Sequence, residues 1–423
     1  MNSLKVRIYP NKEMTSNLNN LLGCNRFVYN ELLDFKLQAY EFNKTNMTSS
    51  DLQHYFHLIL LPQHEFLQKF NSNILKENVL TIFNSFTGFY KGTTGFPQFK
   101  KKSDDQSCKF RPHTSISRKN LKDGKLNLTK NIKGINFRTS KRDKQFILNH
   151  SDDIQNITIS KTKSGDFYAS ILFKTDDKIK ELKESVKLIT GFDLGVKNFV
   201  VGSDKSVYEN LHFFKKEEKK LKRLQRELSR KQNGSKNREK ARKRLAEKFE
   251  EITNKKNNYI HEITTKIVEE NQFIVLENLN VAGMIRNHKL AKSIQEMNFG
   301  EFRKQIEYKA KLYNRTVLFI DRWFPSSKRC SCCGKKNKDL KLSDRMFICP
   351  HCGKIIDRDL NAAINILLEG IRIILGMWYP DVKFVDYPTM DEKIGVITDV
   401  LKSSDKLKQK ELEEIVDLLS TFI

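Results

Sequence analysis

Four of the seven cysteines form two knuckles that most constrain how this chain can fold. Cys330 and Cys333 make one C-x-x-C pair, and Cys349 and Cys352 make another, with 15 residues between the pairs. A glycine follows each pair and accepts the tight backbone that such a turn needs. Four thiolates directed at one point match tetrahedral zinc in a closed structural site, which leaves no open position for a substrate. The spacing therefore predicts a zinc ribbon in which the metal holds the fold together and does no chemistry.

The remaining cysteines fit neither a second metal site nor a disulfide framework. Cys24 and Cys108 are isolated along the chain, whereas Cys332 stands directly beside a knuckle cysteine. Adjacent side chains diverge, so Cys332 is expected to be spare, and His351, between two ligands, is expected at the surface. Such clustering indicates a metal in a reducing compartment rather than disulfides.

The charge of the chain indicates a polyanionic partner. Its formal net charge is +26 and its pI is about 9.6, which favours nucleic acid. A ribosomal or chromatin-type protein, or a membrane-surface binder, is the alternative on charge alone. No apolar run approaches the ~20 residues of a membrane span, and "MNSLKVRIYPNKE" lacks the apolar core of a signal peptide. We therefore expect a cytoplasmic protein without a membrane partner.

The amino-terminal part of the chain changes its pattern twice. "SLKVRIYP" alternates apolar and basic residues before Pro10 and predicts a short strand. Apolar residues at three- and four-residue spacing then predict helices from about Lys12 to Tyr90. From Lys91 to about Ile189, alternating runs such as "KLNL", "QFILNH", "NITISKT" and "FYASILFKT" predict an antiparallel sheet or a small barrel.

A basic and aromatic stretch opens this β region. "FPQFKKKSDDQSCKFRPHTSISRKN" interleaves phenylalanine with lysine and arginine. Cations suit phosphates and rings suit bases, so the stretch predicts a nucleic-acid surface that includes Lys100, Lys101 and Lys102. Each phenylalanine could equally belong to the core.

In the second half of the chain, strands alternate with helices. Apolar runs in "VKLITGFDLGVKNFVVGSD", "QFIVLENLNV" and "RTVLFID" predict strands, and "NFGEFRKQIEYKAKLY" and "DLNAAINILLEGIRIIL" predict helices, which together indicate an α/β domain. Between the strands, 213–270 predicts a helical hairpin that turns at "NGS". Its polar face carries mostly positive charge, which favours phosphate contact over simple solvation.

Carboxylates stand at the ends of apolar strands and at the start of the last helix. Asp193 could be a turn former, Glu277 a solvent-facing strand end, and Asp359 a helix N-cap beside Asp357. Together they suggest more, because carboxylates gathered at one sheet edge repel unless cations lie between them. Two Mg²⁺ ions are the usual solution, and such a pair hydrolyses phosphodiesters. A strongly basic chain with this site suggests a nuclease.

Several stretches resemble the TnpB family, the RNA-guided DNA endonucleases encoded by a class of bacterial insertion sequences. They are "GFDLGVKNFVV", "LKRLQRELSRKQNGSKNREKARKRLAEKFEEI", "IVLENLNVAGM", "EYKA", "FPSSKRCSCCG" and "DRDLNAAINIL". "KVRIYP", "RFVYNELL" and "FPQFKKK" extend a thinner match toward the amino terminus. The chain departs from the family pattern after Gly370. A similar nuclease core occurs in compact type V CRISPR effectors, so an effector of that kind is an alternative.

The resemblance implies a RuvC-type, RNase H-like nuclease with a structural Zn²⁺ and two Mg²⁺ ions. Asp193, Glu277 and Asp359 would be its catalytic and magnesium-binding residues. Asp357 competes with Asp359 for the third position, and we expect Asp359. The implied partners are a guide RNA and double-stranded target DNA that carries a short adjacent motif, and a monomer is favoured.

The resemblance also implies a domain order in a multidomain chain of α/β plus β class. A β-barrel-type wedge domain would contain an inserted helical recognition domain, and a RuvC domain would contain the zinc-ribbon insert. The expected ranges are 1–11 for the first wedge strand, 12–90 for the recognition domain, 91–188 for the wedge β domain, 189–327 for the RuvC domain with its hairpin, 328–355 for the ribbon, 356–375 for the last RuvC segment, and 376–423 for a tail with a helix.

Two sets of residues are candidates for nucleic-acid contact besides the lysines of the β region. We expect Ser326, Ser327 and Lys328, just before the ribbon, to lie close to the scissile strand. The candidates on the hairpin are Lys222, Arg223, Arg226, Arg230, Lys236, Arg238, Lys240, Arg242 and Lys243. Two other functions stay open: a guided DNA-binding protein or transposition accessory that does not cleave, and a transposase that joins strands.

Overall fold

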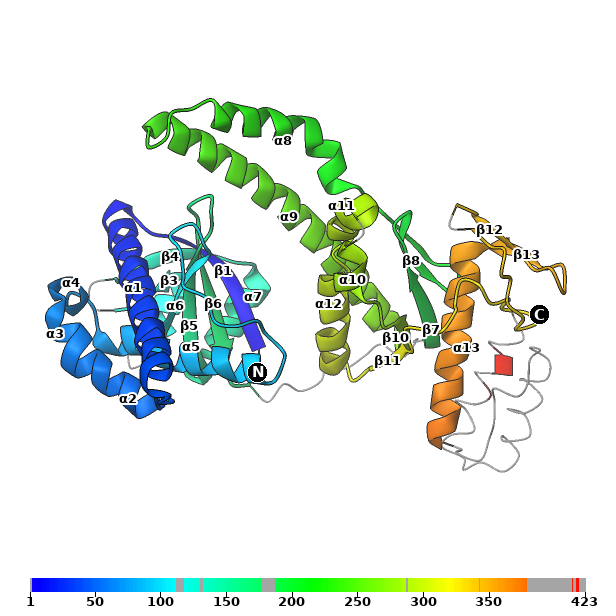
Figure 1. The fold of residues 1–423 in the computed structure, drawn as a ribbon, viewed down its shortest axis with the longest axis horizontal. Helices are drawn as coiled ribbons and strands as arrows, with labels where there is room; N and C mark the ends of the chain where they lie inside the picture. The colour runs from blue at the N-terminus through cyan, green and yellow to red at the C-terminus, as the bar shows by residue number, and fades with distance from the viewer. Residues whose placement is uncertain are drawn as a thin grey trace. The chain divides into compact units, whose positions relative to one another are not determined.

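The structure is a computed structural model that describes residues 2–111, 118–129, 132–175, 187–286, 288–341, 343–378, 413, 416 and 417. The chain divides into two compact units (Figure 1). The amino-terminal unit contains Met1–Asp177 and Leu224–Lys248, and the carboxy-terminal unit contains Lys178–Arg223 and Phe249–Ile423. The predicted tail helix lies outside the described residues, apart from Glu413, Val416 and Asp417. The predicted mixed α/β architecture is confirmed.

A six-stranded antiparallel sheet forms the centre of the amino-terminal unit. Its strands follow the order β2-β5-β6-β1-β4-β3, so the first strand of the chain lies between two later ones. Alternate side chains of β6 are buried, from Phe167 to Phe173, as expected for a strand with one face on a core. The strands are β1 (Asn2–Tyr9), β2 (Gln106–Phe110), β3 (Lys125–Leu126), β4 (Ile135–Arg138), β5 (Ile154–Lys161) and β6 (Phe167–Phe173).

Helices between β1 and β2 pack on the same core. The long helix α1 begins after Asn11, whose side chain accepts a hydrogen bond from Met14 N, as an N-cap does. α1 and α5 are joined by a buried bond from Asn78 Nδ2 to Asn25 Oδ1 at 2.7 Å. The elements are α1 (Lys12–Asn43), α2 (Ser49–His54), the π-helix η1 (Tyr55–Leu60), α3 (Leu61–Gln63), α4 (Glu65–Gln68) and α5 (Ser72–Tyr90).

The prediction of a strand at "QFILNH" is wrong. Lys141–Asn149 forms helix α7, next to the short elements α6 (Arg118–Lys122) and η2 (Ser151–Asp153). Ser140 caps α7, because its hydroxyl accepts a 3.0 Å hydrogen bond from Asp143 N. The cap starts a helix whose Ile147 is buried and whose Phe146 packs on Phe173. The residue that caps the helix, Ser140, lies five residues before "QFILNH". The apolar run taken by itself therefore suggested a strand.

The carboxy-terminal unit contains a five-stranded mixed sheet in the order β11-β10-β7-β8-β9. β10 pairs in parallel with β7 and β11, whereas β8 and β9 continue the sheet in antiparallel pairs. The carboxyl ends of β7, β10 and β11 therefore meet at one edge of the sheet. The strands are β7 (Lys187–Leu194), β8 (Asn198–Gly202), β9 (Val207–Glu209), β10 (Asn271–Glu277) and β11 (Thr316–Ile320).

Helices cover both faces of this sheet. On β10, Val275 belongs to the apolar cluster with α13, whereas Ile274 and Leu276 belong to the cluster with α12 and α9 (Lys236–Glu270). This alternation explains why β10 reads as a continuous apolar run. The helices are α10 (Val281–Ile285), α11 (His288–Met297), α12 (Phe299–Leu312) and α13 (Arg358–Trp378), and the hairpin β12 (Met346–Ile348)–β13 (Ile355–Asp357) precedes α13.

The predicted hairpin consists of α8 (Phe213–Ser229) and α9 (Lys236–Glu270). Near the turn, Arg238 Nη1 donates to the carbonyls of Leu228 at 3.2 Å and Lys231 at 2.8 Å. Arg238 therefore satisfies carbonyls that the end of α8 leaves without helical partners. At the far end of the pair, the rings of Phe214 and Phe249 lie 6.3 Å apart.

Candidate active site and metal centre

Asp193 and Glu277 stand side by side at the carboxyl edge of the sheet. In the parallel pair β7–β10, Phe192 is the register partner of Leu276, and the two acids directly follow these residues. Both carboxylates are half-buried. Burial and the negative charges of Glu277 and Asp359 raise the pKa of Asp193 well above its usual value.

Helix α13 brings Asp359 to the same edge because it packs very closely on β7. A Cβ built on Gly191 would lie 2.4 Å from Leu367 N and 2.5 Å from Ala363 O. Only a residue without a side chain lets the helix backbone approach this strand. Ala363 is one helical turn after Asp359, and Gly191 is two residues before Asp193. Gly191, the first glycine of "GFDLG", therefore allows the close packing that positions Asp359.

The structure distinguishes the two neighbouring acids, Asp357 and Asp359. Oδ1 of Asp357 accepts hydrogen bonds from Asp359 N at 2.9 Å and from Leu360 N at 3.1 Å. Asp357 thus caps the start of α13, a role that the sequence had also allowed for Asp359. The side chain of Asp359 is left to interact electrostatically with Asp193.

The pKa of each of the three carboxylates is raised. Burial raises the pKa of Glu277, and burial together with the charge of Asp357 raises the pKa of Asp359. Three nearby cations oppose the shift of Asp359: Arg345, Arg358 and Lys197. Like charges in a partly buried site favour a bound cation. Among the described residues, the three acids do not converge within 4.8 Å as the cysteines below do.

Ser326 holds the carboxylate of Glu277. Its hydroxyl donates a hydrogen bond to Glu277 Oε1, and this bond opposes the rise in the pKa of Glu277. Ser326 is itself buried. We expect Ser326 beside the scissile strand, and the structure directs its hydroxyl to the candidate catalytic acid. Ser327 is half-buried and Lys328 is exposed.

Two asparagines of α13 bind the segment that leads into the cysteine knuckles. Nδ2 of Asn365 donates to Ser326 O at 2.8 Å and to Arg329 O at 2.6 Å. Asn361 donates to Arg329 O at 2.7 Å and accepts from Ser331 N at 3.0 Å. The sequence analysis missed both residues. The sequence could have identified them, because two asparagines four residues apart in an apolar helix lie on one face. When such side chains are buried, they need polar partners.

The four knuckle cysteines converge. Their sulfur atoms lie within 4.8 Å of one another and form a group that could hold a metal ion. Cys330 Sγ lies 3.7 Å from Cys352 Sγ, and Cys333 Sγ lies 3.5 Å from Cys349 Sγ. Cys332 is outside the group, as expected from the sequence, and His351 is exposed.

The two knuckles have the same backbone geometry. Gly334 and Gly353 have φ of 71° and 72°, a region that strains other residues. The glycine nitrogens donate to Cys330 O at 3.0 Å and Cys349 O at 3.1 Å. Cys330 N and Cys349 N each donate, at 2.9 Å, to the carbonyl of the lysine after the glycine. These turns direct both cysteines of a pair to one side.

The hairpin candidates divide into exposed cations and one structural residue. Arg238 is half-buried, and its guanidinium already donates hydrogen bonds to backbone carbonyls at the end of α8. Arg242 donates to Glu239 Oε1 at 3.2 Å and Lys163 O at 3.4 Å, although it remains exposed. The other exposed candidates are Lys222, Arg223, Arg226, Arg230, Lys236, Lys240 and Lys243.

The three lysines of the β region also differ. Nζ of Lys100 lies 3.8 Å above the ring of Tyr29, and its backbone is paired with Asn30 in both directions. Burial lowers the pKa of Lys100. Lys101 and Lys102 are exposed, so they are better placed than Lys100 to reach a phosphate.

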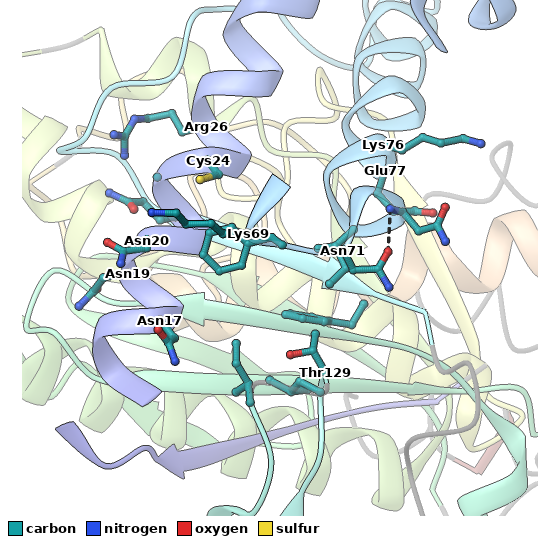
Figure 2. Close-up of a pocket in the computed structure, with 18 of the residues that line it drawn as sticks. Asn17, Asn19, Asn20, Cys24, Arg26, Lys69, Asn71, Lys76, Glu77 and Thr129 are labelled. Carbon is teal, nitrogen blue, oxygen red and sulfur yellow. Dashed lines mark hydrogen bonds between the residues drawn. The ribbon is translucent and has the colours of Figure 1, made fainter. Parts of the chain in front are cut away.

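A large cavity lies in the amino-terminal unit, between the helices and the sheet (Figure 2). Its volume is about 1800 Å³. Its lining is mixed: apolar side chains such as Phe70 and Leu80 alternate with amides, cations and two acids, Glu77 and Glu239. Glu77 is paired with Arg111 at 2.6 Å. The polar lining includes Asn17, Asn19, Asn20, Arg26, Lys69, Asn71, Lys76, Lys102 and Lys161.

Among the described residues, no helix is long and apolar enough to cross a membrane.

Three family models match successive parts of the chain. Residues 1–45 match a "Helix-turn-helix domain" and residues 170–288 match a "Probable transposase", both of the OrfB type of IS605 elements. Residues 299–366 match a "Cas12f1-like, TNB domain". The last two ranges contain Asp193, Glu277, Asp359 and all four knuckle cysteines.

Known proteins match over most of the chain. A "Putative RNA-guided DNA endonuclease" of Streptomyces pristinaespiralis is 30% identical over 372 residues, 87% of this chain and 89% of the relative. "Putative RNA-guided DNA endonuclease InsQ" of Escherichia coli (strain K12) is 25% identical over 390 residues, 88% of this chain and 93% of the relative. A structure described as "Cryo-EM structure of the Cas12f1-sgRNA-target DNA complex" shares the fold, with TM-score 0.53 and 17% identity over 84% of this chain and 82% of that chain.

These matches confirm the resemblance noted in the sequence. The relative from Streptomyces pristinaespiralis aligns with the chain over 89% of its own length. Relatives that match over a shorter stretch carry the name "TnpB-like protein". The protein therefore belongs to the TnpB family of proteins encoded by insertion sequences.

Proposed function

We propose that this protein is an RNA-guided, Mg²⁺-dependent DNA endonuclease of an IS605-type insertion sequence. It cleaves DNA that is complementary to its guide RNA and lies next to a short adjacent motif. The observation that carries the proposal is the meeting of Asp193, Glu277 and Asp359 at one sheet edge, where each has a raised pKa. Relatives named as RNA-guided DNA endonucleases support the guided character.

The donor set fits Mg²⁺. Carboxylate oxygens are the ligands that this ion prefers, and three acids gathered in a partly buried site favour a bound cation. Asp193, Glu277 and Asp359 would hold two ions in a RuvC-type site. When bound, such a pair activates a water molecule and stabilises the leaving oxygen of a phosphodiester.

The surrounding residues of the chain prepare the site for a nucleic-acid strand. Ser326 fixes the orientation of Glu277, and Asp357 fixes the helix start that presents Asp359. Lys197, Arg345 and Arg358 bring positive charge to Asp359, where a phosphate backbone would otherwise be repelled.

The cysteine cluster fits a structural Zn²⁺. Cys330, Cys333, Cys349 and Cys352 supply four sulfur ligands, so that no position remains open for a substrate. We infer that the ion fixes the ribbon of 328–355 against α13. Asn361 and Asn365 then transmit that rigidity to Ser326 and so to Glu277.

The partners follow from this assignment. The guide RNA pairs with the target strand, so base pairing selects the sequence while the protein binds backbone and duplex shape. The exposed cations of the hairpin, together with Lys101 and Lys102, are the proposed backbone contacts. The cavity of the amino-terminal unit, whose polar lining is rich in amides and cations, is a further nucleic-acid surface in this proposal. In this proposal, the wedge, recognition, RuvC and ribbon domains occupy the residue ranges predicted from the sequence.

The test is cleavage by the purified complex. RNA that co-purifies with the protein is sequenced, and DNA matched to its variable end is offered with Mg²⁺ and a library of flanking sequences. We expect cutting of matched DNA only, and none by Asp193→Asn. Binding without cutting by the unaltered protein favours a guided DNA-binding protein instead. Joined strands among the products favour a transposase, and a heterogeneous mixture of cellular RNA contradicts guiding.

A further inference from the structure

A tryptophan beside the candidate active site is almost fully exposed. Trp323 is 84% exposed, the highest value among the large hydrophobic side chains that the structure describes. Its neighbour Phe324 behaves oppositely, since it packs against the apolar cluster of α13 and β10. Thus one ring of this aromatic pair anchors the loop, and the other is presented to the surface. Burial of a ring of this size is normally strongly favourable, so an exposed tryptophan beside a candidate active site is a candidate contact for a ligand.

The loop that carries Trp323 is attached to Glu277 at both ends. On the strand side, Ile320 is the register partner of Glu277 in the pair β10–β11. After only five residues the chain returns to Glu277 through the hydroxyl of Ser326. Trp323 occupies the middle of this loop, so its backbone stays within about 10 Å of both attachment points.

Hydrogen bonds give the loop a defined shape. Asp321 Oδ1 accepts from Trp323 N at 2.7 Å, and Asp321 O accepts from Phe324 N at 3.1 Å. Ser326 N in turn donates to Phe324 O at 2.9 Å. These bonds fix the backbone of the turn that carries Trp323. A ligand that binds the exposed ring would therefore not first have to order this backbone.

The charge around the ring selects the class of ligand. Arg322 and Lys328 on the same segment are exposed cations, and Arg329 places its guanidinium 5.9 Å from the ring of Phe324. Cations that follow a backbone, combined with a free aromatic face, are the two elements of single-stranded nucleic-acid binding. In a duplex, neighbouring base pairs cover the faces of each base, so only an unpaired strand offers a face to stack on.

We propose that Trp323 stacks on an unpaired base of the DNA strand presented to Asp193, Glu277 and Asp359. It is a positioning residue, because it fixes the register of the strand and does not touch the reacting phosphate. The inference rests on the proposed function, because it takes its strand from that reaction.

The first test uses the fluorescence of Trp323. The chain has two tryptophans, so Trp378→Phe leaves Trp323 as the reporter, and Asp193→Asn in the same protein prevents cutting. The probe is matched target DNA bound to the full complex with its co-purified guide RNA. We expect binding to quench the emission. A series of targets with one abasic position each should identify a single position at which quenching is lost.

The second test separates stacking from a structural role. Trp323→Ala should raise the target concentration for half-maximal cleavage roughly 5- to 150-fold, the range expected for one stacked base. Trp323→Phe should restore most of the affinity because it retains a ring. At the abasic position found above, the unaltered protein and Trp323→Ala should become equal. Phe42→Ala, at a residue that is 77% exposed on α1, is the matched control and should change nothing.

Two outcomes overturn the stacking proposal: emission that is insensitive to DNA, or quenching that no abasic position removes. Equal cleavage by Trp323→Ala and the unaltered protein also contradicts it. Failure of the proposed function looks different, since the unaltered complex would then cut no matched DNA. Quenching in the Asp193→Asn background would still report stacking in that case, so the two failures are distinguishable.

Discussion

Asp359 donates its backbone N–H to the carboxylate of Asp357, with a distance of 2.9 Å from N to Oδ1. Two acids that are two residues apart therefore perform separate tasks. Asp357 satisfies N–H groups that the first turn of α13 would otherwise leave unpaired. Asp359 keeps its own carboxylate for the acidic site, where it contributes to the raised pKa of Asp193.

Substitution should separate the two tasks. Asp357→Ala removes a helix cap and should lower stability by about 1 kcal/mol while cleavage is retained. Asp359→Ala should abolish cleavage without a comparable loss of stability. Thermal unfolding and cleavage of matched DNA, measured on both variants, check this. Abolished cleavage in Asp357→Ala with full activity in Asp359→Ala would reverse the assignment.

Zinc content should follow the four converging cysteines. Cys333→Ser removes one sulfur ligand, so the purified protein should lose most of its zinc and unfold at a lower temperature, because a structural zinc site contributes folding energy. Cys332→Ser is the matched control one residue away and should retain one zinc per chain, since Cys332 lies outside the group. Elemental analysis by mass spectrometry gives the readout. Equal zinc loss in both variants would contradict the ligand assignment.

The Ser326–Glu277 hydrogen bond should matter for metal affinity. Ser326→Ala frees the Glu277 carboxylate, and loss of such a supporting contact typically costs about 10- to 100-fold in metal affinity or activity. We expect the Mg²⁺ concentration for half-maximal cleavage to rise in Ser326→Ala. Ser327→Ala serves as control because Ser327 is next in sequence and lies outside this bond. Identical Mg²⁺ titrations of the two variants would exclude the positioning role.

Arginines of the hairpin should differ in their effects. Arg238→Ala removes the bonds to Leu228 O and Lys231 O, so it should destabilise the turn of the hairpin and increase hydrogen exchange there. Arg230→Ala, at an exposed position, should leave exchange unchanged. It should instead weaken RNA or DNA binding and reduce the salt dependence of the binding constant by about one contact. Fluorescence anisotropy at several salt concentrations distinguishes them.

The buried Lys309 should give the carboxy-terminal unit a pH-dependent stability. Its Nζ donates to His261 O and to the hydroxyls of Thr264 and Thr265, each at 2.7 Å, and burial lowers its pKa from 10.5 to about 8. Between these values the unfolded chain binds the extra proton, so stability rises with pH.

This contribution is measured against Lys309→Met, which lacks the titrating amine. The free energy of unfolding of the unaltered protein should rise relative to Lys309→Met by on the order of 1–2 kcal/mol between about pH 7.5 and about pH 9.5. Lys304→Met, at an exposed position of the same helix, should follow the unaltered protein. Urea unfolding at both pH values gives the comparison, and parallel curves for all three proteins would contradict it.

The local chemistry of the site could be predicted from the sequence. Knuckle spacing and trailing glycines predicted which cysteines would converge, because a C-x-x-C turn is formed by its own few residues. The apolar runs before Asp193 and Glu277 predicted strands, and parallel strands necessarily bring their carboxyl ends to one edge. The strand predicted at "QFILNH" failed because the cap at Ser140 and the packing on Phe173 outweighed a short apolar run.

By itself, the sequence determined the identity of the acids, the thiols and the excess of positive charge. Only the tertiary structure decided how they are held. The close approach of α13 to Gly191, the bond from Ser326 to Glu277 and the bonds from Asn365 to the knuckle segment join residues that are distant along the chain. Likewise, the exposure of Trp323 beside a partly buried Phe324 depends on which of the two rings packs on the core. Such contacts arise when helices and strands pack, and no local pattern of residues encodes them.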